Sequence, residues 1–358
     1  MKAKRADLVP GCVLLNDIYV RTAQPIMTRK TVLTKEHLDV LEAFLIDEVE
    51  VEPFLNNGEP FLPKQPLTNK NQDEHISDNP LIQAYFEGVQ KYKTFFQSWQ
   101  KGQPVDIFSV IGFFNPLIDQ FLSAPKELMS LYLYSGKADY LFHHAVAVGL
   151  MSAYFARKLH YSKKEVYEIG LSGLLADCGM AKLPPSVYEK ANRLTKTEYL
   201  LLEKHPIYSY QMLKDLPTVK EGVVLAVLQH HERLDGSGYP LKLSHEQLHP
   251  YGKVIAVIDV FHAMICLRPY RPKHPIFKVL EMIYHDQFGK FDHKIISSLM
   301  DEIARFSLGT KVMLSNHQLA EIVFTDPQKP TRPIVRLENG ATLALANHPD
   351  LYIEDILS

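Results

Sequence analysis

The chain has little of what secreted and membrane proteins carry. Its 358 residues include 3 cysteines, Cys12, Cys178 and Cys266, which are too far apart for a disulfide framework or a Cys-x-x-Cys metal site. No apolar run approaches the roughly eighteen residues of a membrane-spanning helix. The start, MKAKRADLVPG, is basic but lacks the apolar core of a signal peptide. We therefore expect a protein of the reducing cytoplasm with no membrane span.

An excess of charge of either sign is also missing. The 39 lysines and arginines nearly balance the 41 aspartates and glutamates, for a formal charge of −2. Without a basic excess, a nucleic acid polymer or an anionic membrane is not the expected partner, although a local phosphate site is compatible with this balance. The 46% of hydrophobic and 22% of charged residues are typical of a folded chain with two or three domains.

The first part of the chain predicts a small α/β module. CVLLNDIYV and QPIMTRKTVLT alternate as strands do, Thr34 begins an amphipathic helical run, and EVEVEP closes the segment as a short strand. The following stretch is rich in Asn, Pro, Lys, Asp and Gln, as linkers are. We place the module at residues 1–55 and the linker at 56–80.

Residues 81–130 predict a helical connector. Apolar residues recur there at spacings of three and four: Ile82, Tyr85, Val89, Tyr92, Phe96 and Trp99. This spacing indicates a helix that pairs with another helix. The partner is either a second copy of the chain, which would make this a dimerisation helix, or another part of the same chain. The spacing does not separate these alternatives.

The first sign of a functional site is at His230 and His231, which end an apolar run. They begin the segment HHERLDGSGYP, which continues as an acidic, glycine-rich turn. Buried imidazoles need partners, and histidine is a common metal ligand. A helix C-terminus can end in histidine because cations suit its dipole, which would explain one such residue. The pair followed by this turn favours a metal site.

Other segments place histidine or aspartate on the inner face of predicted helices. His144 belongs to the apolar stripe of YLFHHAVAVGLMSAYFARKL, whereas His143 points elsewhere. Asp177 ends the nearly uncharged run GLSGLLAD, where a carboxylate needs a cation or a donor. His205 follows a capped helical run, and Asp259 lies in an apolar helix. Each alone could be a satisfied core residue, and for Asp177 a metal ion is the most economical partner.

These segments together resemble the HD-GYP family, bacterial metal-dependent phosphodiesterases that act on cyclic di-GMP. HHERLDGSGYP is similar to the motif that names the family, LLADCGMAKLP to its LLHDxGKxxxP segment, and KANRLTKTEYLLLEKHP to the segment that follows. The resemblance covers about residues 139 to 272. It implies an all-helical HD-GYP domain, which we place at 131–306.

The resemblance also implies a site. One or two divalent transition-metal ions, iron, manganese or zinc, would be held by His144, Asp177, His205, His230, His231 and Asp259. Asp177 would bridge two ions and is the expected catalytic residue. The phosphates of cyclic di-GMP would be contacted by Arg268, Arg271 and Lys182. The named loop would consist of Asp235, Gly236, Gly238, Tyr239 and Pro240.

This sequence departs from the family pattern at two positions of one segment. Ala176 stands where the family has a histidine and offers no ligand atom. Met180 stands where a phosphate-contacting lysine is expected and carries no charge. In addition, Tyr140 occupies the place of a glutamate that holds a third ion in some members. We therefore expect hydrolysis of cyclic di-GMP to be impaired or lost.

Two classes of function remain open. The first is a weak metal-dependent cyclic di-GMP phosphodiesterase. The second is a non-catalytic domain that binds cyclic di-GMP, or that binds signalling proteins through the GYP loop. Whether the chain is an enzyme is thus left open by its sequence, while the ancestry is the same for both classes.

The last part of the chain predicts a small antiparallel sheet. After a helix that ends at Phe306, the segments LGTKVMLS, QLAEIVFTD, RPIVRLENG and TLALAN alternate as short strands and are separated by turn signals. We expect a structural or regulatory β subdomain at 307–358. The fold class predicted for the whole chain is mainly α, with a small α/β module at the start and a small antiparallel β subdomain at the end.

Overall fold

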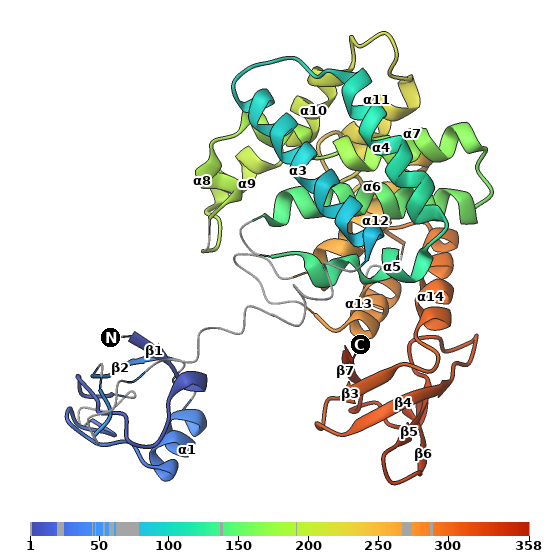
Figure 1. Ribbon diagram of the computed structural model, residues 1–358. Coiled ribbons are helices and arrows are strands. Elements are labelled where there is room, and N and C mark those ends of the chain that lie inside the picture. The colour runs from blue at the N-terminus through green and yellow to red at the C-terminus, as the bar shows by residue number, and fades with distance from the viewer. Residues whose placement is uncertain are drawn as a thin grey trace. The chain divides into compact units, whose positions relative to one another are not determined.

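The computed structural model describes residues 2–19, 25–44, 46, 48–52, 54–56, 61, 79–136, 139–190, 192–266, 274–286 and 289–357. The chain divides into two compact units, Met1–Asp78 and Asn79–Ser358. Helices make up most of the second unit, and a small sheet follows them at its C-terminal end (Figure 1). The predicted fold class, mainly α with a small module first and an antiparallel sheet last, is confirmed.

The first unit combines one helix with short strands. Its elements are β1 (Lys2–Lys4), η1 (Arg5–Asp7), α1 (Lys35–Ala43) and β2 (Glu48–Glu50), and β1 pairs antiparallel with β2. The longer strands expected from the alternation are instead isolated bridges, Val13 to Val32 and Ile18 to Met27. Phe61, from the segment predicted as linker, is buried in the core of this unit. The module therefore extends beyond the predicted boundary at residue 55.

The second unit begins with a helix whose apolar seam is covered by the same chain. α3 (Pro80–Gln100) buries Ile82, Tyr85, Val89, Tyr92, Phe96 and Trp99. It packs on α4 (Ile107–Leu122) and α6 (Tyr140–Lys158), and the ring of Phe96 lies 5.5 Å from that of Phe142. The seam is thus an intramolecular contact. Of the two alternatives, the structure shows the seam packed on the same chain, so the seam no longer supports a homodimer. Residues 81–130 belong to the helical unit and do not form a separate connector.

The rest of the helical unit consists of short helices joined by turns. In order they are α5 (Pro125–Ser130), η2 (Leu131–Tyr134), α7 (Lys163–Leu175), η3 (Cys178–Lys182), α8 (Pro185–Tyr188), α9 (Lys196–Leu202), α10 (His205–Leu213), α11 (Glu221–Gln229), η4 (His245–Gln247), α12 (Pro250–Ile265), α13 (Ile276–Glu281), the π-helical turn η5 (Met282–Asp286) and α14 (His293–Phe306). Reciprocal capping boxes, Ser162 with Glu165 and Thr195 with Glu198, fix the starts of α7 and α9.

The centre of the helical unit is the pair α6 and α7. α6 is buried from His143 to Ala156 on all sides, as expected for a core helix. The two helices approach so closely that a Cβ on Gly149 would lie 2.9 Å from the backbone oxygen of Gly170. α11 and α12 pack against the same pair. From these four helices, or directly after them, come all the predicted metal ligands except His205.

No single helix in the described part of the chain is long and apolar enough to cross a membrane. α4 and the segment Pro125–Tyr134 are long and apolar enough only when they are counted together, and the chain bends by 107° between them. Within α4, the residues Val110, Phe114 and Phe121 are buried.

The C-terminal residues form an antiparallel sheet, as predicted, and it has a fifth strand, β7 (Ile353–Leu357), beyond the four predicted segments. Its strands are β3 (Lys311–Leu314), β4 (Leu319–Phe324), β5 (Ile334–Leu337), β6 (Thr342–Ala344) and β7, in the order β6-β5-β4-β3-β7 (Figure 1). The guanidinium of Arg332 pairs with the carboxylate of Glu281 on α13, at 2.9 Å for the longer contact. The ammonium of Lys278 lies 4.9 Å over the ring of Tyr352. These contacts attach the sheet to the helical unit.

Candidate metal centre

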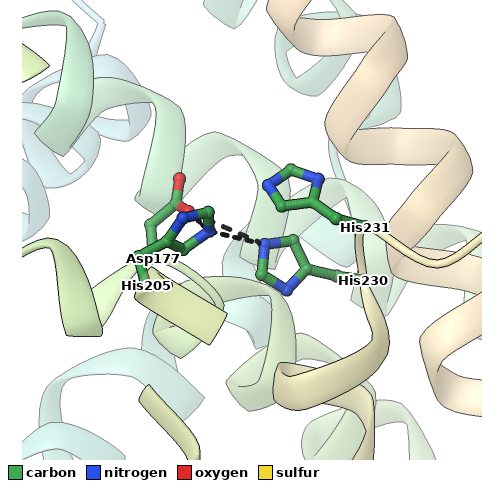
Figure 2. Close-up of side chains that lie close together, drawn as sticks. All are labelled: Asp177, His205, His230 and His231. Atoms are coloured by element: carbon green, nitrogen blue, oxygen red, sulfur yellow. Dashed lines mark hydrogen bonds and ion pairs between the residues drawn. The ribbon is translucent and has the colours of Figure 1, made fainter. Parts of the chain in front are cut away.

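Four of the predicted ligands gather at one point. Asp177 follows α7, His205 begins α10, and His230 and His231 follow α11, yet their side chains lie close together (Figure 2). One donor atom from each lies within 4.8 Å of the other three. Oδ1 of Asp177 is 3.0 Å from Nε2 of His205 and 3.7 Å from Nε2 of His230. We call these residues the first cluster.

Backbone carbonyls orient two imidazoles of the first cluster. Nδ1 of His205 lies 2.7 Å from the carbonyl oxygen of Leu202, and Nδ1 of His230 lies 2.7 Å from that of Val227. Both carbonyls belong to the last turn of a helix, where carbonyls lack a helical donor. A ring nitrogen beside a carbonyl must donate, so in each neutral ring Nε2 carries a lone pair. These two Nε2 atoms face one another at 3.2 Å.

Two Nε2 atoms and one carboxylate oxygen of the first cluster therefore face one another as hydrogen-bond acceptors, with no hydrogen between them. Neither neutral Nε2 can donate to the other, and Oδ1 of Asp177 is buried with no hydrogen bond from any described residue. Lone pairs directed to one point are satisfied by a cation. Imidazole and carboxylate donors together suit zinc, iron or manganese. The residues of this cluster thus fit a transition-metal ion.

The pKa shifts of Asp177 and His231 agree with this reading, whereas that of His230 favours its protonated form. Burial raises the pKa of Asp177, but His205 and His230 outweigh burial and hold this pKa well below its usual range. Burial lowers the pKa of His230, but Asp177 outweighs burial and the pKa lies above its ordinary value. Burial, together with the charge of His230, holds the pKa of His231 well below its ordinary value. The ionised carboxylate and a neutral His231 are the forms that bind metal.

A close approach of two backbones sets His205 beside Asp177. η3 and α10 lie so near that a Cβ on Gly179 would be 2.2 Å from the carbonyl oxygen of His205. The hydroxyl of Ser209 accepts from the backbone N–H of Gly179 at 2.7 Å and donates to the carbonyl of Ala176 at 2.8 Å. Only glycine fits at this position, and Ser209 ties the end of α7 to α10. Sequence reasoning missed Ser209, because a hydroxyl on a helix leaves no spacing signal.

A second group shares Asp177 with the first. His144, Asp177 and Asp259 offer donor atoms within 4.8 Å of one another, and all three residues are buried. Nε2 of His144 is 2.8 Å from Oδ1 of Asp259 and 3.8 Å from Oδ2 of Asp177. Burial raises the pKa of Asp259, but His144 and His231 outweigh burial and lower it. We call this group, which has three donors where the first has four, the second cluster.

The two departures from the family pattern lie between the end of α7 and the start of α8. Ala176 is the C-cap of α7 and is buried, and its carbonyl accepts from Ser209. Met180 is buried in η3. A methyl group and a thioether therefore occupy interior positions where a ligand and a cation are expected, and neither supplies a charge or a strong donor.

Of the three predicted substrate contacts, Lys182 lies among the described residues. Lys182 is exposed, and its ammonium donates to the carbonyl of Trp99 on α3 at 3.3 Å. Its part in phosphate binding stays a prediction without support from this contact. Arg268 and Arg271 lie outside the described residues.

His143 points away from the clusters, as its place on α6 predicted. Its Nδ1 lies 3.0 Å from the hydroxyl of Tyr85, and its ring packs against those of Tyr85 and Phe86. Burial lowers the pKa of His143 to about 4. This histidine is a neutral core residue between α3 and α6.

A buried carboxylate holds the loop after His231. The side chain of Glu232 accepts three backbone N–H groups at 2.6 to 3.0 Å, from Leu241, Lys242 and Leu243. The loop folds back so tightly that a Cβ on Gly238 would lie 2.4 Å from Cα of Glu232. The ring of Tyr239 is consequently placed 4.7 Å from that of His231. Glu232 was not predicted to have this role.

The remaining loop residues shape an exposed turn. The carboxylate of Asp235 accepts from the backbone N–H and the hydroxyl of Ser237 at 3.0 and 2.6 Å, and Gly236 has a φ of +75°. Asp235 and Ser237 are exposed, while Tyr239 and Pro240 are half-buried and joined by a cis peptide bond. The loop thus presents a polar tip to solvent and an aromatic ring to the first cluster.

Comparisons with known proteins show what this chain is similar to. A family model described as an HD domain matches residues 129–295. A cyclic di-GMP phosphodiesterase of Pseudomonas aeruginosa is 30% identical over 228 residues, which cover 64% of this chain and 55% of that protein. A 3'3'-cGAMP-specific phosphodiesterase of Vibrio cholerae is 28% identical over 195 residues, which cover 52% of this chain and 44% of the relative. The chain therefore spans about half the length of these curated relatives.

A solved structure extends the likeness to the fold. A protein of Bdellovibrio bacteriovorus described as HDG"Y"P superposes with a TM-score of 0.52 at 16% identity, and the match covers 85% of this chain and 99% of that one. At this identity the likeness concerns the fold alone. The HD domain match and the similarity to cyclic di-GMP phosphodiesterases support the assignment of this chain to the HD-GYP family, and the solved structure agrees with them in fold.

Proposed function

We propose that this protein is a cyclic di-GMP-binding HD-GYP domain that holds at least one transition-metal ion and whose hydrolysis of cyclic di-GMP is impaired or lost. One observation carries the proposal. The first cluster has four donors, whereas the second has three, and Ala176 directly precedes their shared Asp177 in the chain. Four protein donors suffice for a tightly held ion, and three leave a site that depends on solvent or substrate for completion.

The carboxylate of Asp177 is placed to serve both clusters. Its Oδ1 faces His205 and His230, and its Oδ2 faces His144. Two ions, when bound, supply a Lewis acid and a water of lowered pKa for opening a phosphodiester. Asp177 would bridge them, the imidazoles would fix their positions, and the apolar surroundings of α6 and α12 would keep bulk water out. Loss of a donor from the second cluster weakens this pairing at one of its two halves.

Met180 adds a second deficit at the same step. A lysine in this segment would contribute a positive charge as negative charge builds on the phosphate oxygens, and such electrostatic groups are commonly worth on the order of 10²–10³ in rate. The methionine sulfur offers none. Arg268 and Arg271 remain the proposed nucleotide contacts. In this proposal the protein therefore still binds cyclic di-GMP after its hydrolysis is lost.

The alternative function is a receptor or protein-interaction scaffold that uses the GYP loop. Its support is that the loop is held by Glu232 and Gly238, without any contribution from a metal ligand's donor atoms. The exposed tip at Asp235 and Ser237 is available to a partner. In this alternative the loop is recognised by another signalling protein and cyclic di-GMP is not hydrolysed.

The test combines binding and turnover on one sample. Protein reconstituted with manganese, iron or zinc is titrated with cyclic di-GMP by calorimetry, and linear product is then followed by chromatography, with 3'3'-cGAMP run in parallel because relatives act on it. The matched control is Asp177→Asn, which keeps the shape of the side chain and removes its charge. We expect binding of cyclic di-GMP with turnover roughly 10²-fold or more below that of a family member with His and Lys at the two positions. Turnover at the rate of such a member would contradict the proposal, and no binding of either dinucleotide would favour the scaffold.

A further inference from the structure

His144 differs from His205 and His230 in what holds its outer nitrogen. Nδ1 of His144 lies 2.9 Å from Nδ1 of His262, with the hydroxyl of Tyr140 at 3.2 Å. No backbone carbonyl takes this place among the contacts described for His144. His262 lies on α12, is fully buried, and belongs to neither cluster. The partner of Nδ1 is therefore an imidazole for His144, whereas it is a backbone carbonyl for His205 and His230.

The position of His144 in its helix explains the difference. His144 lies in the first half of α6, Tyr140–Lys158, so the carbonyls one turn before it accept helical N–H groups. His205 and His230 lie at helix boundaries, where the carbonyl three residues earlier is available. A ligand histidine inside a helix must be oriented by a side chain of a neighbouring helix. For His144 that helix is α12, which packs on α6.

Two hydrogen arrangements fit the close pair of nitrogens. If Nδ1 of His262 donates, Nε2 of His144 carries the other hydrogen and donates to Asp259 at 2.8 Å, which closes the second cluster to an ion. If Nδ1 of His144 donates, its Nε2 presents a lone pair between Asp259 and Asp177. Only the second arrangement lets His144 serve as a ligand. If Nδ1 of His262 accepts, the ligand form of His144 is selected.

We propose that His262 is a positioning residue for the second cluster: by accepting the Nδ1 hydrogen of His144 it fixes the tautomer that leaves Nε2 for an ion. This rests on the metal centre of the proposed function and adds a residue outside both clusters. Partners of this kind orient ligand histidines, and their loss typically costs 10- to 100-fold in metal affinity. The sulfur of Cys266, a weak acceptor, lies 3.5 Å from Nε2 of His262 and 3.6 Å from its Nδ1.

The proposal predicts an effect on one of two ions. His262→Phe keeps an aromatic ring and removes both nitrogens, while His262→Asn keeps an acceptor near the place of Nδ1. Mn²⁺ binding is measured on the whole protein without nucleotide, by equilibrium dialysis with electron paramagnetic resonance of the free ion, and folding is checked by circular dichroism. We expect His262→Phe to weaken the second, weaker ion at least about tenfold and to leave the first unchanged. His262→Asn should keep the second ion within about threefold of the native protein.

His143→Phe is the matched control, because His143 is the preceding buried histidine of α6 and contacts Tyr85 rather than the clusters. It should leave both ions unchanged. Native protein that takes up only one ion at high Mn²⁺ would overturn the proposal, as would unchanged affinities in His262→Phe, equal losses in the Phe and Asn variants, or loss of both ions. Absent hydrolysis with both ions bound would bear on the proposed function and leave this assignment standing.

Discussion

The two clusters show two ways of holding a ligand histidine. In the first, His205 and His230 stand at helix boundaries, and carbonyls of the preceding turn orient their rings. In the second, His144 and Asp259 stand inside helices, and the ring of His144 is oriented by the side chains of His262 and Tyr140. Backbone groups cannot be lost by substitution, whereas side-chain partners can. The first cluster should therefore be the robust half of the centre and the second the sensitive half.

One of the two family departures, Ala176, falls on the sensitive half. Ala176 removes a donor that the resemblance assigns beside His144, Asp177 and Asp259, whereas all four donors of the first cluster are present. In the proposed function, one metal site declines while its neighbour, which shares the carboxylate of Asp177, persists. The following predictions break or sharpen this contrast.

The largest effect is expected from Gly179→Ala, which breaks the first cluster through the backbone. The added Cβ would meet the carbonyl oxygen of His205 at 2.2 Å and the backbone nitrogen of Ser209 at 2.4 Å, so α10 must move. We expect a loss of roughly 3 kcal/mol in the free energy of unfolding. The affinity for the first ion should fall about 100-fold. Chemical denaturation and metal titration measure the two effects.

Gly112→Ala is the matched control for this change. Gly112 lies within α4, and a Cβ there would meet nothing within 4 Å. Since alanine favours a helix more than glycine does, this variant should be as stable as the native protein or more so, by up to about 1 kcal/mol. Equal destabilisation by both substitutions would contradict the close-approach explanation.

The next effect should come from repairing the sensitive half. Ala176→His together with Met180→Lys restores a donor and a cation, and we expect the double variant to hydrolyse cyclic di-GMP at least about tenfold faster than the native protein, with a second ion held more tightly. Each single variant should fall short of this gain, since both changes act on one step and need not add. Product chromatography and metal analysis provide the measurement.

Met180→Gln, combined with Ala176→His, separates charge from shape in that experiment, because glutamine is polar but carries no charge. A native protein as fast as the double variant would refute the impaired-site argument. A double variant that holds two ions and stays inert would show that the nucleotide pocket itself is lost, which would favour the scaffold function.

The smallest effect concerns the pH dependence of folding at His143, the buried histidine outside both clusters. Burial lowers its pKa to about 4 from an ordinary 6.5, so the folded protein binds fewer protons than the unfolded chain between these values. This contribution to stability is complete above pH 6.5 and is lost as the pH falls toward 4. His143→Phe should flatten the dependence in that window, by at most about 1.4 kcal/mol per pH unit.

Thermal unfolding of both proteins in the presence of a chelator, from pH about 7.5 to about 5, measures this difference while removing proton competition at the metal ligands. Parallel unfolding curves across the window would show that His143 is not the neutral core residue described above.

Sequence reasoning named the candidate ligands from their places in apolar helices and from the resemblance to the HD-GYP family. His144, Asp177, His205, His230, His231 and Asp259 were all identified before the fold, and the structure gathers them into the two clusters. The antiparallel sheet was predicted from the alternation of apolar and polar residues and from the turn signals between its strands. Periodicity and motif position report the inner face of an element, and ligands lie on inner faces.

What sequence did not reveal depends on contacts between distant segments. The seam of α3 has the same spacing whether its partner is a second chain or α6, so only the fold identifies the partner. Ser209, Glu232 and His262 act through hydrogen bonds to residues far along the chain or across helices, and such bonds leave no periodic signal. In the first unit, the strands expected from alternation are single bridges, because tertiary pairing rather than propensity decides strand length.

The most direct test of the central claim is elemental analysis of protein purified without chelator and dialysed, compared among the native protein, His144→Ala and His230→Ala. The account predicts about one transition-metal ion per chain in the native protein, a similar content in His144→Ala, and its loss in His230→Ala. Less than about a tenth of an equivalent in the native protein even after reconstitution, or equal loss in both variants, would contradict it.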